Sequence, residues 1–102
     1  MPAGSFLKDP VEHYPVGINM ARQLPSGRTV SRATVSATDL TEPGDATSTV
    51  LARTTASKTS DTTVEVEVKA GTSFHSYKIF YTIYDNANSV YRESLLMWVR
   101  PV

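Results

Sequence analysis

The chain carries two histidines, and neither stands in a spacing that is typical of a metal site. His13 and His75 belong to no HxxxH-type pair. The chain has no cysteine, so thiolate ligands and disulfides are excluded. We predict that His75 is a solvated strand residue and that neither histidine binds a metal.

Three carboxylates lie close together at Asp39, Glu42 and Asp45, and they raise the question of a calcium site. Their spacing does not match the EF-hand loop. Hard cations need about six or more oxygen ligands, and these three acids lie in a segment typical of a turn. We predict a solvated loop here and no bound metal.

Catalytic patterns are also missing from the sequence. Serine is abundant, but no GxSxG elbow and no glycine-rich phosphate loop is present. Glu93 falls on the predicted inward side of the last strand, and one carboxylate without a partner supports no acid–base pair. We predict no catalytic residue and no cofactor, which leaves a structural or binding module.

Length and charge bound the remaining possibilities. The 102 residues suit one domain, and ten basic against ten acidic residues give a formal net charge of zero. A nucleic-acid-binding protein normally shows a basic stripe, and none stands out in the sequence. No segment approaches the roughly 20 apolar residues of a membrane span. We expect neither a nucleic acid nor a membrane as partner.

The strongest structural pattern is a β-hairpin in the C-terminal part of the chain. Apolar residues alternate before and after the polar tetrad 85–88, which is rich in turn-forming residues. The inward set before the turn is Tyr77, Ile79, Tyr81 and Ile83, and the set after it is Tyr91, Leu95, Met97 and Val99.

The outward positions of this hairpin are apolar as well: Phe80, Tyr84, Leu96 and Trp98. A half-buried strand should carry polar residues there. The hairpin is therefore either covered on both faces or presents an apolar outer face that binds another protein chain.

The rest of the chain reads as short strands separated by turns, without a helical period. Residues 16–24, 28–38, 46–57 and 63–69 are the further expected strands, the third of them weak. This pattern predicts an all-β fold, an immunoglobulin-like β-sandwich of six to seven antiparallel strands over residues 16–102, with a small barrel as the alternative. The predicted core is Val35, Val64, Val66, Val68, Tyr77, Ile79, Tyr81, Ile83, Leu95, Met97 and Val99.

Residues 1–15 are predicted to form an extended N-terminal arm, because they are polar and interrupted by prolines. Within it, Phe6, Leu7, Lys8, Asp9 and Pro10 form a compact mixed motif that could bind a neighbouring subunit. Phe6 and Leu7 would be the apolar anchors. We expect deletion of residues 1–13 to leave the domain folded and to weaken assembly.

A loose series of residues resembles a known family. It contains Phe6-Leu7-Lys8-Asp9-Pro10, Tyr14-x-Val16, Leu24-x-x-Gly27-x-Thr29-Val30-Ser31, Gly71 followed by Tyr77-x-Ile79, and Glu93-Ser94-Leu95-x-Met97-x-Val99. This order is similar to the small β-sandwich virion proteins of tailed bacteriophages, the fibre–tail adaptor or head–neck accessory proteins. The chain departs from them at Gly17-Ile18, where they often carry aspartate and tryptophan.

The resemblance implies a non-enzymatic virion structural protein, assembled in the host cytoplasm. It would bind the head–tail connector or collar as a ring of subunits and adapt fibres or neck components. The implied partners are portal, capsid or fibre proteins and further copies of the chain. Two alternatives stay open: a capsid decoration protein of the same fold, and a carbohydrate-binding or adhesion module that uses Tyr84, Tyr91 or Trp98.

Overall fold

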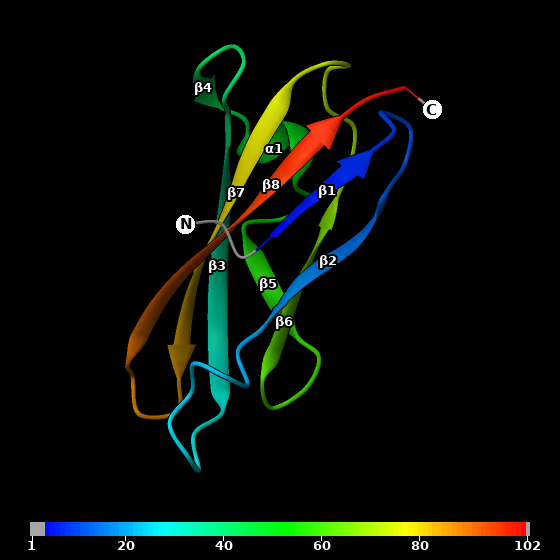
Figure 1. Cartoon of the computed structure of the whole chain (residues 1–102). Helices are drawn as coiled ribbons and strands as arrows, with labels where there is room; N and C mark the ends of the chain where they lie inside the picture. Colours follow the sequence, from blue (N-terminus) through cyan, green and yellow to red (C-terminus); the bar gives the residue numbers. More distant parts are fainter. Residues whose placement is uncertain (1–3, 102) are drawn as a thin grey trace.

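The computed structural model describes residues 4–101, and strands make up most of it (Figure 1). The elements in chain order are β1 (Gly4–Lys8), β2 (Tyr14–Asn19), β3 (Val30–Asp39), β4 (Gly44–Asp45), the one-turn helix α1 (Thr47–Val50), β5 (Thr55–Lys58), β6 (Thr63–Val68), β7 (Ser76–Asp85) and β8 (Val90–Val99). The all-β prediction is confirmed.

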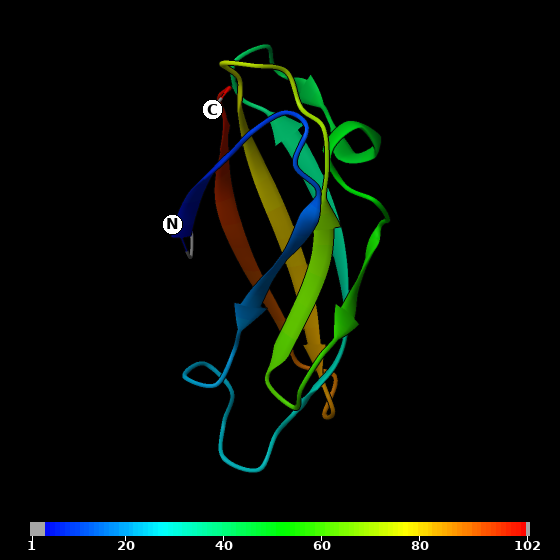
Figure 2. The same cartoon turned by 90° about the vertical axis from the view of Figure 1, so that its right-hand side faces the viewer.

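The strands form one curled, mixed sheet in the order β1-β8-β7-β3-β5-β6-β2, with β4 on the end of β3. Only β1 and β8 pair in parallel among the described strands, which corrects the prediction of a purely antiparallel fold. The short strand β5 pairs with both β3 and β6, so it carries the sheet around the corner. Figure 2 shows the result: β2 and β6 lie across β7 and β8 on the other side of the core.

The β7–β8 hairpin forms in the predicted phase. Antiparallel pairing runs from Ser76↔Trp98 to Tyr84↔Val90, and β3 pairs along the other side of β7. The four inward residues of β7 are each at most 1% exposed. Strict alternation thus places every large apolar residue of this phase in the interior.

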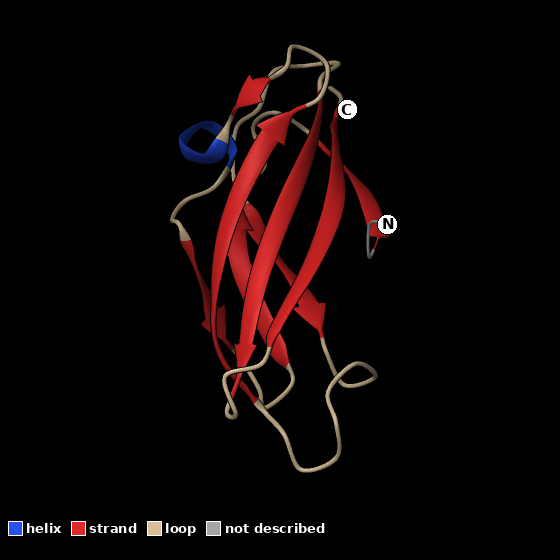
Figure 3. Ribbon diagram, turned by 90° about the vertical axis from the view of Figure 1, so that its left-hand side faces the viewer, coloured by secondary structure: helices blue, strands red, loops and turns tan. Residues whose placement is uncertain are grey.

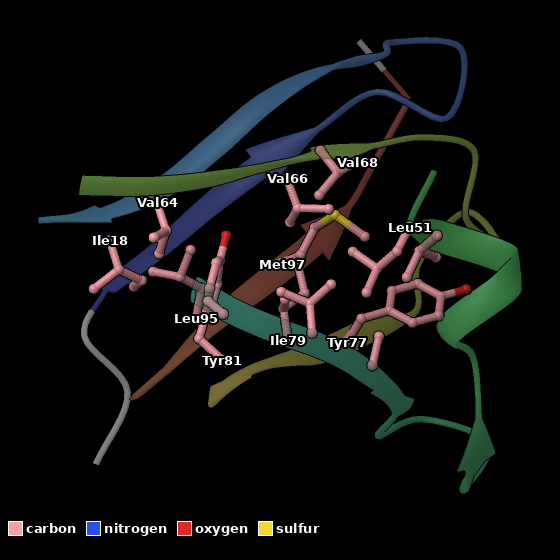
Figure 4. Close-up of a cluster of buried hydrophobic side chains, with 14 of the residues drawn as sticks. Ile18, Leu51, Val64, Val66, Val68, Tyr77, Ile79, Tyr81, Leu95 and Met97 are labelled. Atoms are coloured by element: carbon pink, nitrogen blue, oxygen red, sulfur yellow. The ribbon is translucent and has the colours of Figure 1, made fainter. Parts of the chain in front are cut away.

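The predicted core is confirmed: all eleven residues named from the sequence are buried. Side chains from the β7–β8 half meet valines of β6 and Ile18 of β2 (Figure 4). The Tyr81 hydroxyl donates to the Val16 carbonyl oxygen at 2.9 Å and so links β7 to β2 across the core. Burial raises the pKa of Tyr81, which keeps this donor protonated.

The weak strand predicted over residues 46–57 is only partly a strand. Its first part is α1, and only Thr55–Lys58 is extended. The Thr47 hydroxyl accepts from the Ala37 N–H at 3.0 Å and donates to the Asp45 carboxylate at 2.7 Å. These bonds begin a helical turn that brings Val50 and Leu51 into the core. Side-chain bonds of this kind compete with strand pairing, and periodicity does not reveal them.

The prediction of a separate N-terminal arm over residues 1–15 is not confirmed. Residues 1–3 lie outside the described part, whereas Gly4–Lys8 is an edge strand in register with Leu95 to Val99 of β8. Lys8 is 1% exposed, and its Nζ donates to the Ala70 carbonyl oxygen at 2.7 Å and to that of Asp9 at 2.9 Å. Burial lowers the pKa of Lys8, an effect that the carboxylates of Glu12 and Asp9 oppose. The sequence pattern missed this strand because its inward residue at position 8 is a lysine.

The hairpin turn contains a buried carboxylate. Asp85 ends β7 with its side chain fully buried, and it accepts from the Tyr91 hydroxyl at 2.9 Å and from Arg28 Nη1 at 3.2 Å. It also accepts from the backbone N–H groups of Ala87 and Ser89. Burial alone would raise the pKa of Asp85, but these hydrogen bonds lower it to about 2. The predicted turn at residues 85–88 is therefore built around an ionised group in the interior.

We expect Ile79→Ala to reduce the free energy of unfolding by about 2–5 kcal/mol, because the side chain is fully buried and its removal leaves a cavity. Thr82→Ala on the outward side of the same strand should cost less than about 1 kcal/mol. Urea denaturation measures both. Equal losses for the two variants would contradict the observed phase of the hairpin.

The pairing of β1 reverses our expectation for the N-terminal truncation. Deleting residues 1–13 removes the five pairs with β8 and the Lys8 bonds, so we now expect the melting temperature to fall by about 5 °C or more. Lys8→Met, which keeps the unbranched shape of the side chain but removes its donors, should give part of that loss. An unchanged melting curve for the truncated chain would show that β1 does not stabilise the domain.

Asp85 should make the free energy of unfolding depend on pH in the acid range. Its folded pKa lies below the value of about 3.9 in an unfolded chain. The stabilisation is therefore complete above about pH 4 and is lost as the pH falls through about 2. Asp85→Asn should be less stable at neutral pH and should show a shallower loss of stability between pH 4 and 2. Asp61→Asn, at an exposed carboxylate, is the control and should keep the parental slope.

Candidate protein-binding face

His75 and Asp39 interact with each other within the fold. His75 Nδ1 lies 2.7 Å from Asp39 Oδ2, and the two side chains are 18% and 14% exposed, so the prediction of a solvated His75 is wrong. Asp39 also accepts from the N–H groups of Thr41 and Glu42. Burial would raise the pKa of Asp39, but the bonds from His75, Glu42 and Thr41 lower it. These bonds close the 39–42 turn onto the start of β7.

Neither a metal cluster nor a membrane helix is found in residues 4–101. No group of three or more histidines, aspartates or glutamates there could hold an ion. No helix of that range has the length and apolarity needed to cross a bilayer.

The four outward residues predicted from the hairpin lie together on the outer face of the sheet. Phe80, Tyr84 and Leu96 are half-buried, and Trp98 is 42% exposed. Figure 3 shows the outer side of the long strands β3, β7 and β8 uncovered by any other described element. The sequence left open whether the hairpin is covered on both faces. Within the described residues its outer face is not covered.

The motif at residues 6–10 is divided between interior and surface. Leu7 is 69% exposed and pairs with Trp98, so it extends the outer face onto β1. Phe6 points the other way, packs against the core and contacts the Tyr14 ring at 6.2 Å between centroids. Lys8 is buried, while Asp9 and Pro10 belong to the turn that follows β1. Of the predicted apolar anchors, only Leu7 lies on the outer face.

Cations lie over the aromatic rings of this face. Arg32 Cζ lies 3.7 Å from the centroid of the Tyr84 ring, a close stacking contact. Lys78 and Arg92 lie 5.3 and 5.6 Å from the Phe80 centroid. These contacts join three strands, which explains why the sequence did not reveal them. The only local signal is the Lys78–Phe80 pair, two residues apart on one strand.

The charge of the outer face is one-sided. Its outward positions on β1, β8, β7 and β3 follow from the strand registers and contain arginine, lysine, serine, threonine and apolar residues, but no aspartate or glutamate. Two carboxylates border the face: Asp45 on β4 pairs with Thr38, and Glu93 lines a hollow with Lys78, Phe80 and Arg92. The neutral total of the chain hides this distribution. We call this surface the basic–aromatic face; its defining residues are Leu7, Arg32, Lys78, Phe80, Tyr84, Arg92, Leu96 and Trp98.

The carbohydrate alternative named three aromatic rings, and each of them contacts another group of the chain; Arg100 Cζ lies 5.7 Å from the Trp98 centroid. Arg32 stacks on Tyr84, and the Tyr91 hydroxyl donates to the buried Asp85. Tyr91 is half-buried on the inward phase of β8, away from the basic–aromatic face. Trp98 is the ring of the three that is most open to solvent.

No family model matches this chain, and no curated protein is significantly similar to it in sequence. The geometry of the basic–aromatic face therefore carries the functional argument.

Proposed function

We propose that the chain is a non-enzymatic structural protein that binds other protein chains through its basic–aromatic face. The observation that supports this is an uncovered sheet face with exposed Leu7 and Trp98 and with no carboxylate at the outward positions of β1, β8, β7 and β3. Exposed apolar residues gathered on one face commonly mark protein interfaces. Arginine and aromatic residues are also the types enriched in such interfaces.

The more specific proposal follows from the family resemblance. The chain is a virion component of a tailed bacteriophage, bound as a ring of subunits at the head–tail connector or collar, with portal, capsid or fibre proteins as neighbours. We further propose that the curled sheet is an immunoglobulin-like sandwich. The support is the way its two halves face each other across one core, joined through β5.

A capsid decoration protein would use the same face, so copy number separates the two locations. A closed ring at the neck holds about a dozen copies, whereas a shell holds hundreds, since the symmetry of the host surface sets the count. Cryo-microscopy of purified particles measures location and copy number together.

Trp98→Ser should fold and yet be depleted from particles in a complementation experiment, because it removes the most exposed aromatic ring of the basic–aromatic face. Leu40→Ser is the matched control: Leu40 is 46% exposed but lies in the loop after β3. Quantitative mass spectrometry of purified particles gives the readout, with melting curves to establish folding. Absence of the parental chain from particles would refute the virion proposal.

A further inference from the structure

Phe74 combines exposure with an unfavourable backbone conformation. Its side chain is 66% exposed, and its φ angle is 67°. A positive φ is uncommon for any residue with a side chain and is a marked outlier for a bulky one. Such strain persists where the surroundings impose it and is frequent at binding sites.

The hydrogen bonds around Phe74 explain its backbone conformation, but they do not explain why the residue is a phenylalanine. The Phe74 N–H donates to the Val99 carbonyl oxygen at 2.7 Å, and the Val99 N–H donates to the His75 carbonyl oxygen at 3.0 Å. These bonds close the entry to β7 against the end of β8. A glycine would adopt this conformation without strain, so the fold alone does not call for a phenylalanine here.

Arg100 connects the Phe74 ring to other exposed apolar groups. Arg100 Cζ is 5.7 Å from the ring centroids of both Phe74 and Trp98, and Leu7 pairs with Trp98 from β1. Next to them is a shallow groove of about 340 Å³ lined by Ser5, Phe6, Leu7 and Trp98. We call Leu7, Phe74, Trp98 and Arg100 the aromatic anchor; three segments distant in sequence build it.

The charge of the aromatic anchor indicates what it recognises. Arg100 Nη1 donates to the carbonyl oxygens of Val99 at 2.7 Å and His75 at 3.4 Å, and these two acceptors, which carry no charge, position the guanidinium. The adjoining basic–aromatic face adds Lys78 and Arg92, which outnumber the one carboxylate beside them, Glu93. A complementary partner therefore supplies negative charge. Leu7 and the groove beside it add aliphatic surface, which fits an apolar side chain of a protein segment.

We propose that the aromatic anchor binds a short segment of a partner protein in which an apolar side chain stands beside a carboxylate. The apolar group packs against Leu7, Phe74 and Trp98, and the carboxylate approaches Arg100. This inference rests on the proposed protein-binding function and adds the chemistry of the partner. Small clusters of aromatic and arginine residues commonly dominate the affinity of an interface.

The first test compares Phe74→Gly with Ala70→Gly. Ala70 also has a positive φ, 46°, and is exposed, but it has no ring. Both variants relieve backbone strain, so both should melt at or above the parental temperature. If Phe74→Gly melts well below Ala70→Gly, the ring stabilises its own domain and the proposal is overturned.

The second test measures binding of synthetic peptides by NMR titration of the full chain. The probes are a peptide of alternating glutamate and leucine, one of lysine and leucine, one of glutamate and serine, and single-stranded oligothymidylate. The glutamate–leucine peptide should bind at least about tenfold more tightly than the other three, and should shift the amide signals of residues 5–7, 74 and 98–100. Phe74→Gly and Leu7→Ser should each weaken it by about tenfold, and Ala70→Gly should not.

The proposal is overturned if the lysine–leucine or the glutamate–serine peptide binds as tightly as the glutamate–leucine peptide, or if oligothymidylate binds more tightly. It is also overturned if the shifted signals lie elsewhere on the chain, or if the glutamate–leucine peptide does not bind. This outcome is independent of the particle experiment. Loss of peptide selectivity refutes the aromatic anchor and leaves the virion proposal standing. Absence of the parental chain from particles refutes the virion proposal and leaves the aromatic anchor standing.

Discussion

The structure depends on the alternation of β7, a ten-residue strand with a neighbour on each side. Its inward residues supply the largest buried side chains and touch both halves of the sheet. Because successive side chains point to opposite faces, the same alternation places Lys78, Phe80 and Tyr84 outward. A shift of one residue would exchange the core with the basic–aromatic face, so fold and binding surface rest on a single register.

Three buried polar groups link β7 and β8 to other parts of the fold. Asp85 holds the hairpin turn together with Arg28 and Tyr91, and Lys8 joins β1 to the loop after β6 through the Ala70 carbonyl. The Tyr81 hydroxyl connects the two halves of the sheet through Val16. No buried side-chain nitrogen or oxygen in the described residues lacks a hydrogen-bond partner. Since an unpaired buried polar group is costly, these contacts restrict the strands to one arrangement.

The proposed binding surface arises where the two ends of the chain meet. Parallel pairing of β1 with β8 brings Leu7 beside Trp98, and the same end of β8 positions Arg100 against Phe74. The sequence analysis had placed an interface on an arm and another on the hairpin. Leu7 joins them into one surface. Cations lie over its half-buried rings and over Phe74 and Trp98, while Leu7, Phe74 and Trp98 stay exposed to solvent.

The amino-acid sequence by itself determined the all-β class, the hairpin and its phase, and the core residues, because burial follows local alternation and turn chemistry. It also placed Phe80, Tyr84, Leu96 and Trp98 on the outer face for the same reason. Tertiary structure alone decided that Lys8 and Asp85 are buried, that residues 47–50 form a helical turn, and that Gly17 faces Glu65 so closely that a β-carbon would lie 2.7 Å from its Cγ. It also decided that Arg32, Arg92 and Arg100 lie over the rings of Tyr84, Phe80 and Phe74, which come from other parts of the chain. Each of these depends on a partner distant in sequence, and periodicity carries no information about which strands become neighbours.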